Sequence, residues 1–175
     1  MKEERMKYPL MALLLTLSGS ALAESITLSA GWATSRFEGS NLNGMNVKAG
    51  YQPDNSPLGL MTSYSYAAQS TAEDIRGNWV ISKVTYHSLQ GGLSYESTPW
   101  LRPYAMLGAA RLGEKYTASN GTFKENGQHD RTAMVYSAGF QVYPVKNVFL
   151  DASYEGTKLY ERRISTYTLG VGWKF

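Results

Sequence analysis

The chain has 175 residues, enough for one domain of ordinary size, and its formal net charge is +3. It has no cysteine, which excludes disulfide frameworks, thiolate zinc sites and cysteine nucleophiles. The only histidines are His87 and His129, so we predict no metal site and no cofactor. The basic residues are scattered rather than gathered in a stripe, which argues against nucleic-acid binding.

The N-terminal segment has the features of a secretory signal peptide. Basic residues precede an almost wholly apolar stretch over residues 9–17, and the segment ends in the small-x-small pattern Ala21-Leu22-Ala23. The apolar stretch is about half as long as the ~20 residues that a membrane-spanning helix requires. We therefore predict a signal peptide over residues 1–23, cleaved near Ala23, and a mature domain over residues 24–175.

The mature chain has a hydropathy period of two, which is typical of strands rather than helices. At the C-terminus, bulky apolar residues alternate with small or polar ones. The bulky face holds Tyr167, Leu169, Val171, Trp173 and Phe175, and the other face holds Thr166, Thr168, Gly170, Gly172 and Lys174. The same division recurs, clearly or weakly, over residues 26–32, 44–51, 58–66, 88–96, 101–112, 134–142 and 148–155. Eight strands are predicted.

Short and long connections alternate between these strands. Three predicted tight turns are rich in Pro, Asn or Ser and cover residues 52–57, 97–101 and 143–147. The predicted loops are three long polar segments and a short fourth one, over residues 35–43, 70–82, 117–130 and 159–163. In an antiparallel up-and-down sheet, this alternation places every tight turn at one end and every loop at the other.

The small residues indicate which face of the sheet points inward. An eight-stranded barrel is only just wide enough for side chains to fill its interior, so small and polar residues suit the inside. The bulky apolar face then contacts lipid, with aromatic residues near both interfaces. We predict an all-β, eight-stranded, antiparallel up-and-down transmembrane barrel, closed by the first and last strands because an open edge in lipid leaves unpaired backbone groups. The alternative is a soluble barrel or sandwich with an aromatic core.

Several charged residues fall on the inward-facing positions. They are Lys48, Glu96, Arg102, Asp151, Glu155 and Lys174. Charges of both signs in a narrow lumen must pair and form hydrogen bonds, because an isolated buried charge is costly. We expect an interior charge network that plugs the barrel. The alternative, an ion pore, is disfavoured by the small lumen of eight strands.

Catalysis has little support in the sequence. His87 lies on the apolar face of its strand and is expected to anchor the barrel near the outer interface. The cluster His129-Asp130-Arg131 is expected to be a solvated part of a long loop. No Gly-x-Ser-x-Gly nucleophile elbow is present. We predict that the protein is not an enzyme and has no catalytic residues.

The predicted loops carry mixed charges together with aromatic residues, a composition that suits contact with proteins or glycans. The most basic run is residues 158–163. We hypothesise that Lys158, Arg162 and Arg163 bind phosphates of lipopolysaccharide or sulfated host glycans, because arginine makes bidentate contacts to such groups. Simple solvation of the barrel rim is the alternative.

Residues 55–66, residues 143–155 and the ending Gly170-Val-Gly-Trp-Lys-Phe175 resemble the Ail/Lom/OmpX family of outer-membrane proteins of Gram-negative bacteria. The resemblance covers nearly the whole mature chain. It implies an eight-stranded barrel with four cell-surface loops, and it carries no catalytic residues to transfer. It also implies a C-terminal signal, here Phe175 with Trp173 and Val171, that the barrel-assembly machinery reads.

Some members of that family mediate adhesion, invasion or resistance to complement, so the resemblance implies these functions as possibilities for this chain. We therefore expect a monomeric surface protein of the outer membrane, in contact with lipid and lipopolysaccharide. Its loops are expected to bind a host cell-surface protein or glycan and to mediate adhesion, invasion or resistance to complement. The alternative is a structural barrel that contributes to envelope integrity without a dedicated host ligand.

Overall fold

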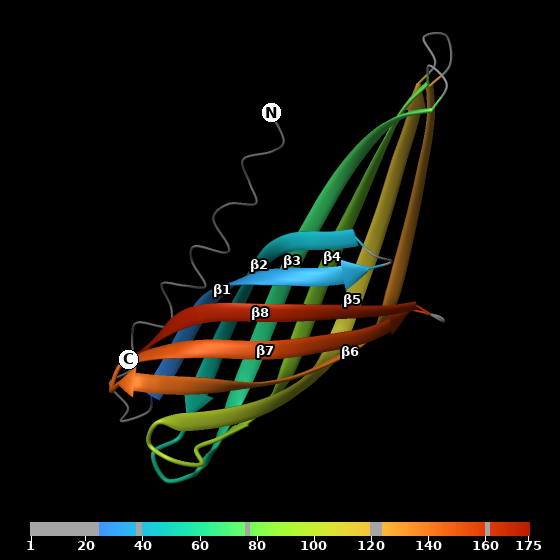
Figure 1. Cartoon of the computed structure of the whole chain (residues 1–175). Helices are drawn as coiled ribbons and strands as arrows, with labels where there is room; N and C mark the ends of the chain where they lie inside the picture. The colour runs from blue at the N-terminus through green and yellow to red at the C-terminus, as the bar shows by residue number, and fades with distance from the viewer. Residues whose placement is uncertain (1–24, 38–39, 76–77, 120–123, 160–161) are drawn as a thin grey trace, which may run out of the picture.

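The computed structural model describes residues 25–37, 40–75, 78–119, 124–159 and 162–175, and these form a closed antiparallel barrel (Figure 1). The strands are β1 (Ser25–Phe37), β2 (Ser40–Gln52), β3 (Leu58–Ile75), β4 (Asn78–Tyr95), β5 (Leu101–Ser119), β6 (Lys124–Val145), β7 (Val148–Leu159) and β8 (Arg162–Lys174). Within these ranges no helix is long and apolar enough to span a membrane. The predicted signal peptide and its cleavage site lie outside the described residues.

The barrel closes through the first and last strands, as predicted. β1 pairs with β8 from Thr27↔Lys174 to Arg36↔Ser165. The backbone N–H of Phe175 extends this ladder by donating to the carbonyl of Ile26, at 2.9 Å. Closure leaves neither terminal strand with an unpaired edge, which is the condition for strands to lie in lipid.

The two faces of the barrel have the predicted orientation. Bulky apolar side chains cover the outside, where Trp32, Leu169 and Met134 are 63%, 72% and 76% exposed. Small and polar side chains such as Ser63 and Thr166 point inward and are buried. This arrangement is the reverse of a soluble barrel, and it corrects the alternative of an aromatic core, because most of the aromatic residues lie outside.

The four central strands are longer than the others. β3, β4, β5 and β6 have 18, 18, 19 and 22 residues, whereas β1, β2, β7 and β8 have 13, 13, 12 and 13. Figure 1 shows the ends of the long strands projecting well beyond the rest of the barrel. The segments predicted as long connections are therefore strand over most of their extent. The sequence left the ends of these strands open, because ladder pairing continues through polar segments that lack the alternation of a lipid-facing strand.

The projecting sheet has two open edges. β2 pairs with β3 only as far as Asn43↔Ala68. β7 pairs with β6 only as far as Thr157↔Val135. Beyond these points, residues 69–75 of β3 and 124–134 of β6 are paired on one side alone, through the β3–β4 and β5–β6 ladders. The projection is thus a four-stranded sheet, not a closed barrel.

The tight turns lie at the opposite end, where they were predicted. The turn between β6 and β7 is shorter than predicted, because β6 continues to Val145. The β6–β7 register shifts between Val142 and Val145. Pro144 lies inside this bulge, where its missing N–H removes no regular ladder bond.

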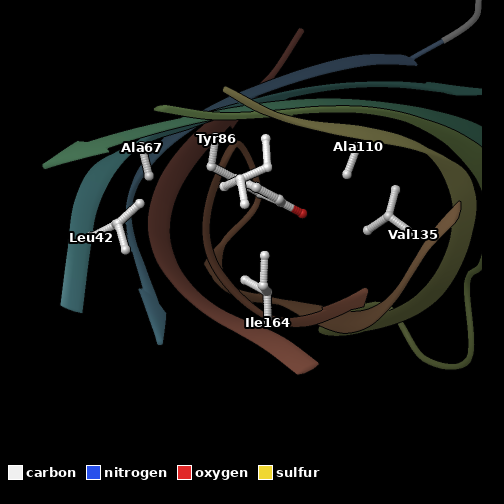
Figure 2. Packing of buried hydrophobic residues seen from close by; sticks show 7 residues of the cluster. Leu42, Ala67, Tyr86, Ala110, Val135 and Ile164 are labelled. Atoms are coloured by element: carbon white, nitrogen blue, oxygen red, sulfur yellow. The ribbon is translucent and has the colours of Figure 1, made fainter. Parts of the chain in front are cut away.

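An apolar layer crosses the lumen near the end from which the long strands project. It consists of Leu42, Ala67, Tyr86, Ala110, Leu112, Val135 and Ile164, all buried. Figure 2 shows six of these labelled side chains pointing into the lumen from the surrounding strands. Leu42 and Ile164 lie near the ends of β2 and β8 that adjoin the projection. The sequence predicted a small and polar inner face, so this layer is an addition to the prediction.

Candidate functional site

Two of the inward charges, Lys48 and Asp151, form a buried ion pair in the lumen. The Lys48 Nζ lies 2.5 Å from Asp151 Oδ1, and both side chains are almost wholly buried. The hydroxyl of Tyr104 donates to the same carboxylate at 3.0 Å, and its ring lies 5.7 Å from the Lys48 ammonium. The carboxylate thus has both a charge partner and a hydrogen-bond donor, which a buried ion needs.

Glu155 is held by neutral donors. Its Oε1 accepts a hydrogen bond from the Tyr86 hydroxyl at 2.5 Å. Its Oε2 accepts from Gln90 Nε2 at 2.6 Å, Ser88 Oγ at 3.1 Å and Ser65 Oγ at 3.2 Å. Tyr86 also belongs to the apolar layer, so a single side chain joins that layer to the polar part of the lumen.

The remaining inward charges lie near the end with the tight turns. Arg102 Nη2 is 3.4 Å from Glu96 Oε2, and the Arg102 guanidinium is 5.4 Å from the centre of the Tyr143 ring. Lys174 is half-buried, and in the described part of the chain its ammonium forms no ion pair with the other predicted charges. The six predicted residues therefore form two ion pairs, one carboxylate bound by neutral donors and one separate lysine.

The chemistry of these interior side chains suits a structural role, in which they stabilise the barrel and fill its lumen. Many hydroxyls, amides and charged groups form hydrogen bonds or ion pairs across the barrel, whereas the buried hydroxyls of Ser94 and Ser137 have no hydrogen-bond partner among the described residues. No group of three or more His, Asp or Glu in the described part of the chain could hold a metal ion. His87 has aromatic neighbours: the Tyr64 hydroxyl is 2.9 Å from His87 Nδ1, and the Tyr66 and His87 rings are 5.0 Å apart. His87 thus lies on the outer face among aromatic residues, where it was expected.

The cluster His129-Asp130-Arg131 lies in β6, not in the loop in which it was expected. Arg111 Nη2 donates to Asp130 Oδ2 at 2.7 Å across the β5–β6 ladder. This is an exposed pair, which contributes little to stability. The side chain of His129 lies outside the described residues.

The predicted anion-binding residues also lie in strands. Lys158 is in β7 and Arg163 is in β8, and they are exact cross-strand partners. Both are exposed on the outer face. Arg162 is the first residue of β8, and its side chain lies outside the described residues. The structure therefore brings two of the three predicted cations side by side on the barrel wall.

Arg36 joins these two cations, although the sequence pattern did not single it out. Arg36 pairs with Ser165 across the β1–β8 ladder, and Ser165 is two residues from Arg163 on the same face. Arg36 and Arg163 are therefore diagonal neighbours, a distance that long side chains can bridge. Closure of the barrel creates this proximity, because β1 and β8 are the first and last strands. We call Arg36, Lys158 and Arg163 the cationic rim.

A second pair of cations lies on the projecting sheet. Lys83 in β4 is the direct cross-strand partner of Lys115 in β5, and both are exposed. Like charges directly opposite each other are destabilising. Neither lysine has an ion-pair partner among the described residues. A bound anion would relieve the repulsion in this pair, as it would between Lys158 and Arg163.

The three residues of the predicted C-terminal assembly signal lie on the outer face, at the end of the barrel with the tight turns. Val171, Trp173 and Phe175 are 55%, 50% and 69% exposed. Val171 pairs with Ala30 of β1, and Trp173 pairs with Leu28. The residues of the predicted signal therefore form part of the seam at which the barrel closes.

Comparison with known proteins places the chain in a family. Residues 10–175 match the family model described as "Outer membrane protein beta-barrel domain". The chain is 32% identical over 170 residues to Outer membrane protein X of Escherichia coli K12, covering 95% of each chain. It is 30% identical over 166 residues to the virulence membrane protein PagC of Salmonella typhimurium, covering 89% of each.

A solved structure shares the whole barrel. The crystal structure of Ail, the attachment invasion locus protein of Yersinia pestis, in complex with the heparin analogue sucrose octasulfate superposes with a TM-score of 0.73. The two chains are 26% identical, and the match covers 87% of this chain and 97% of that one. Fold, orientation of the faces and relatives agree: the chain belongs to the Ail/Lom/OmpX family of small β-barrels and is located in the outer membrane of a Gram-negative bacterium.

Proposed function

We propose that this protein is a non-enzymatic surface protein that binds phosphate- or sulfate-bearing ligands at its cationic rim. Through such binding it mediates adhesion and invasion or resistance to complement. The observation that carries the proposal is the juxtaposition of Arg36, Lys158 and Arg163 on the outer face. Guanidinium groups bind phosphate and sulfate oxygens in bidentate fashion, and a lysine adds a point charge.

The electrostatics of the rim support an anionic ligand. Lys158 and Arg163 repel each other across the ladder, and no described carboxylate forms an ion pair with any of the three rim cations. The similar barrel of Ail was crystallised with a heparin analogue. Sulfated host glycans and lipopolysaccharide phosphates present the same chemistry to this surface.

The projecting sheet supports a role outside the cell. Short turns of outer-membrane barrels face the periplasm and the longer connections face the exterior. The sheet formed by β3 to β6 therefore extends away from the bacterium, with Lys83 and Lys115 on its outer face. Exposed strands with mixed charges offer a surface that a host protein or glycan can contact without entering the membrane.

The test is heparin binding by the purified barrel, together with adhesion and serum survival of a non-adherent, serum-sensitive strain that expresses it. We expect the variant R36A/K158A/R163A to bind heparin at least about tenfold more weakly, since each charge-assisted contact contributes about 1.5–3 kcal/mol. Adhesion and serum survival should fall with heparin affinity.

A matched control is available at the other end of the barrel. Lys146 is exposed in the turn between β6 and β7, so K146A removes a surface cation from the periplasmic side. We expect K146A to bind heparin like the wild type. Unchanged heparin affinity in the triple rim variant would refute the proposed site.

The second candidate function is a structural barrel that supports envelope integrity without a dedicated host ligand. The filled lumen favours it, because the buried pair Lys48–Asp151 and the apolar layer suit a rigid plug rather than a conduit. An envelope defect on deletion, with no gain of adhesion or serum survival on expression, would support this function instead.

The C-terminal residues Val171, Trp173 and Phe175 act in assembly. They form an alternating apolar face at the seam, which the barrel-assembly machinery contacts before β1 pairs with β8. The barrel then works as a monomer, since closure leaves no membrane-embedded edge for a second copy to extend.

A further inference from the structure

Glu155 in β7 is a buried carboxylate that lacks a cationic partner. Its side chain crosses the lumen and is bound by four neutral donors from β3 and β4. It is 4% exposed, and within the described ranges no cation forms an ion pair with it. Neutral donors stabilise a buried carboxylate, but they do not balance its charge.

The other paired charges of the lumen balance one another. Lys48 is paired with Asp151, and Arg102 is paired with Glu96. Each of these pairs is neutral as a unit, so neither has a positive charge to spare. Glu155 therefore remains as an excess negative charge in the part of the lumen that the structure describes.

The surroundings of Glu155 along the barrel axis do not supply the missing charge. Thr166 is the cross-strand partner of Glu155, and Lys174 lies at the other end of the same strand, ~26 Å away along it. On the outer side, Glu155 adjoins the apolar layer through Tyr86, and that layer contains no charged residue. The balancing cation must therefore come from outside the chain.

Two buried oxygens beside Glu155 have no hydrogen-bond partner among the described residues. Gln90 donates through Nε2 to Glu155 Oε2 at 2.6 Å, while its Oε1 is unpartnered. Turning the amide over would place its oxygen against the carboxylate, which fixes this orientation. Ser137 is the direct cross-strand partner of Glu155, and its hydroxyl is unpartnered as well. Buried polar atoms without a partner are rare and mark the place of a water molecule or an ion.

We propose that Glu155, Gln90 and Ser137 form a binding site for a monovalent cation of the size of sodium. Hard cations bind carboxylate, amide and hydroxyl oxygens, so such a site needs no histidine and no cluster of acidic residues. A water molecule would satisfy the amide oxygen but not the charge. A divalent ion would replace an excess negative charge by an excess positive one, so the charge balance favours a monovalent ion.

The carboxylate has bonding capacity left for an ion. Glu155 Oε2 accepts three hydrogen bonds, whereas Oε1 accepts one, from Tyr86. A carboxylate oxygen has two lone pairs, so Oε1 can bind a cation without losing its hydrogen bond. The ion exists in this site only when β3, β4, β6 and β7 are assembled, so it stabilises the folded barrel and not the unfolded chain. The site is independent of the cationic rim and of the proposed function.

The test compares equilibrium urea unfolding of the purified barrel in lipid vesicles, in sodium chloride and in tetramethylammonium chloride at equal ionic strength. Tetramethylammonium surrounds its charge with methyl groups and cannot approach oxygen ligands closely. At a sodium concentration of about ten times the dissociation constant, sodium should lower the unfolding constant of the wild type about tenfold. An equilibrium measurement does not depend on the route by which the ion enters the lumen.

Two variants remove parts of the site, and a third serves as a matched control. Glu155→Gln removes the charge and keeps the shape, so its unfolding constant should be equal in the two salts. Gln90→Met removes the amide oxygen and should need at least about threefold more sodium for the same stabilisation. Gln141 is buried in the same lumen, and its amide bonds Asp151, whose charge Lys48 balances. Gln141→Met should therefore respond to sodium like the wild type.

Several outcomes would overturn the site. Equal unfolding of the wild type in the two salts would show that no sodium binds. A sodium response that persists in Glu155→Gln would place the ion elsewhere. An equal loss of the response in Gln90→Met and Gln141→Met would show a general loosening of the lumen instead of a lost ligand. Heat-modifiable migration on gels verifies that each variant is folded, and the two methionine variants keep the test decisive if Glu155→Gln does not fold.

Discussion

Individual side chains inside the barrel are stabilised by partners that come from distant strands. The carboxylate of Asp151 in β7 contacts Lys48 of β2 and Tyr104 of β5. Removing one member of a buried pair leaves the other charged and unpaired, which costs more than the pair itself contributes. The stability of the lumen therefore depends on matching the members of each pair rather than on the number of charges.

This reasoning gives a prediction for the central ion pair. Lys48→Met leaves Asp151 without its cation and should lower the free energy of unfolding by about 3–5 kcal/mol. Adding Asp151→Leu should restore most of that loss, because the buried charge is then absent. Urea unfolding in lipid vesicles, followed by tryptophan fluorescence, measures both variants. A double variant as unstable as Lys48→Met would contradict the prediction.

At the scale of the strands, the segment of β6 within the closed barrel and the segment in the projecting sheet have different surroundings. Residues 135–142 are paired on both sides and lie in the closed barrel. Residues 124–134 are paired with β5 alone and belong to the projecting sheet. A strand with one partner and no surrounding lipid opens at a lower free energy than a strand within a closed ladder.

We therefore predict a gradient of hydrogen exchange along β6. Backbone amides in 124–132 should exchange roughly 100-fold faster than those in 135–142, which corresponds to an opening free energy about 2.8 kcal/mol lower. Hydrogen exchange with mass spectrometry in lipid nanodiscs measures both segments in one experiment. The tightly paired β7 serves as an internal reference. Equal protection of the two segments would show that the projection is as stable as the barrel.

At the scale of the whole molecule, the lumen is filled by two kinds of side-chain cluster, one apolar and one hydrogen-bonded. The apolar layer with Leu112 and Ile164 lies near the outer end, and the hydrogen-bonded Glu155 joins it through Tyr86. An apolar constriction excludes water, and ions do not cross a segment from which water is excluded. We therefore expect the apolar layer to keep ions from entering the lumen from the outer end.

The corresponding prediction concerns conductance in planar bilayers. The wild type should give no resolved current steps. L112S/I164S should admit water to the outer lumen and give brief, small steps. Leu169→Ser, which changes an exposed lipid-facing leucine, controls for the effect of a new hydroxyl. Current through the wild type would contradict a closed lumen, and silence of the double variant would show that the polar groups alone close it.

Much of the fold follows from residue alternation. Tyr167, Leu169 and Val171 alternate with Thr168, Gly170 and Gly172, and lipid outside a narrow lumen permits only one orientation of such a strand. The tight turns follow from their Pro, Asn and Ser residues. The lengths of β3 to β6 could not be predicted, because outside the membrane both faces of a strand meet water and the alternation disappears.

The sequence by itself determined the strands of the barrel, their orientation toward lipid and the inward position of the charged residues, because period-two patterning acts locally along each strand. Only the tertiary structure decided which of those residues meet. Closure brings Arg36 of β1 beside Arg163 of β8, and ladder register places Lys158 opposite Arg163 and Lys48 near Asp151. The proximity of Arg36 to Arg163 and of Lys48 to Asp151 depends on strands that are far apart in the chain, and the pairing of Lys158 with Arg163 depends on ladder register. Local patterning carries no information about register across the barrel.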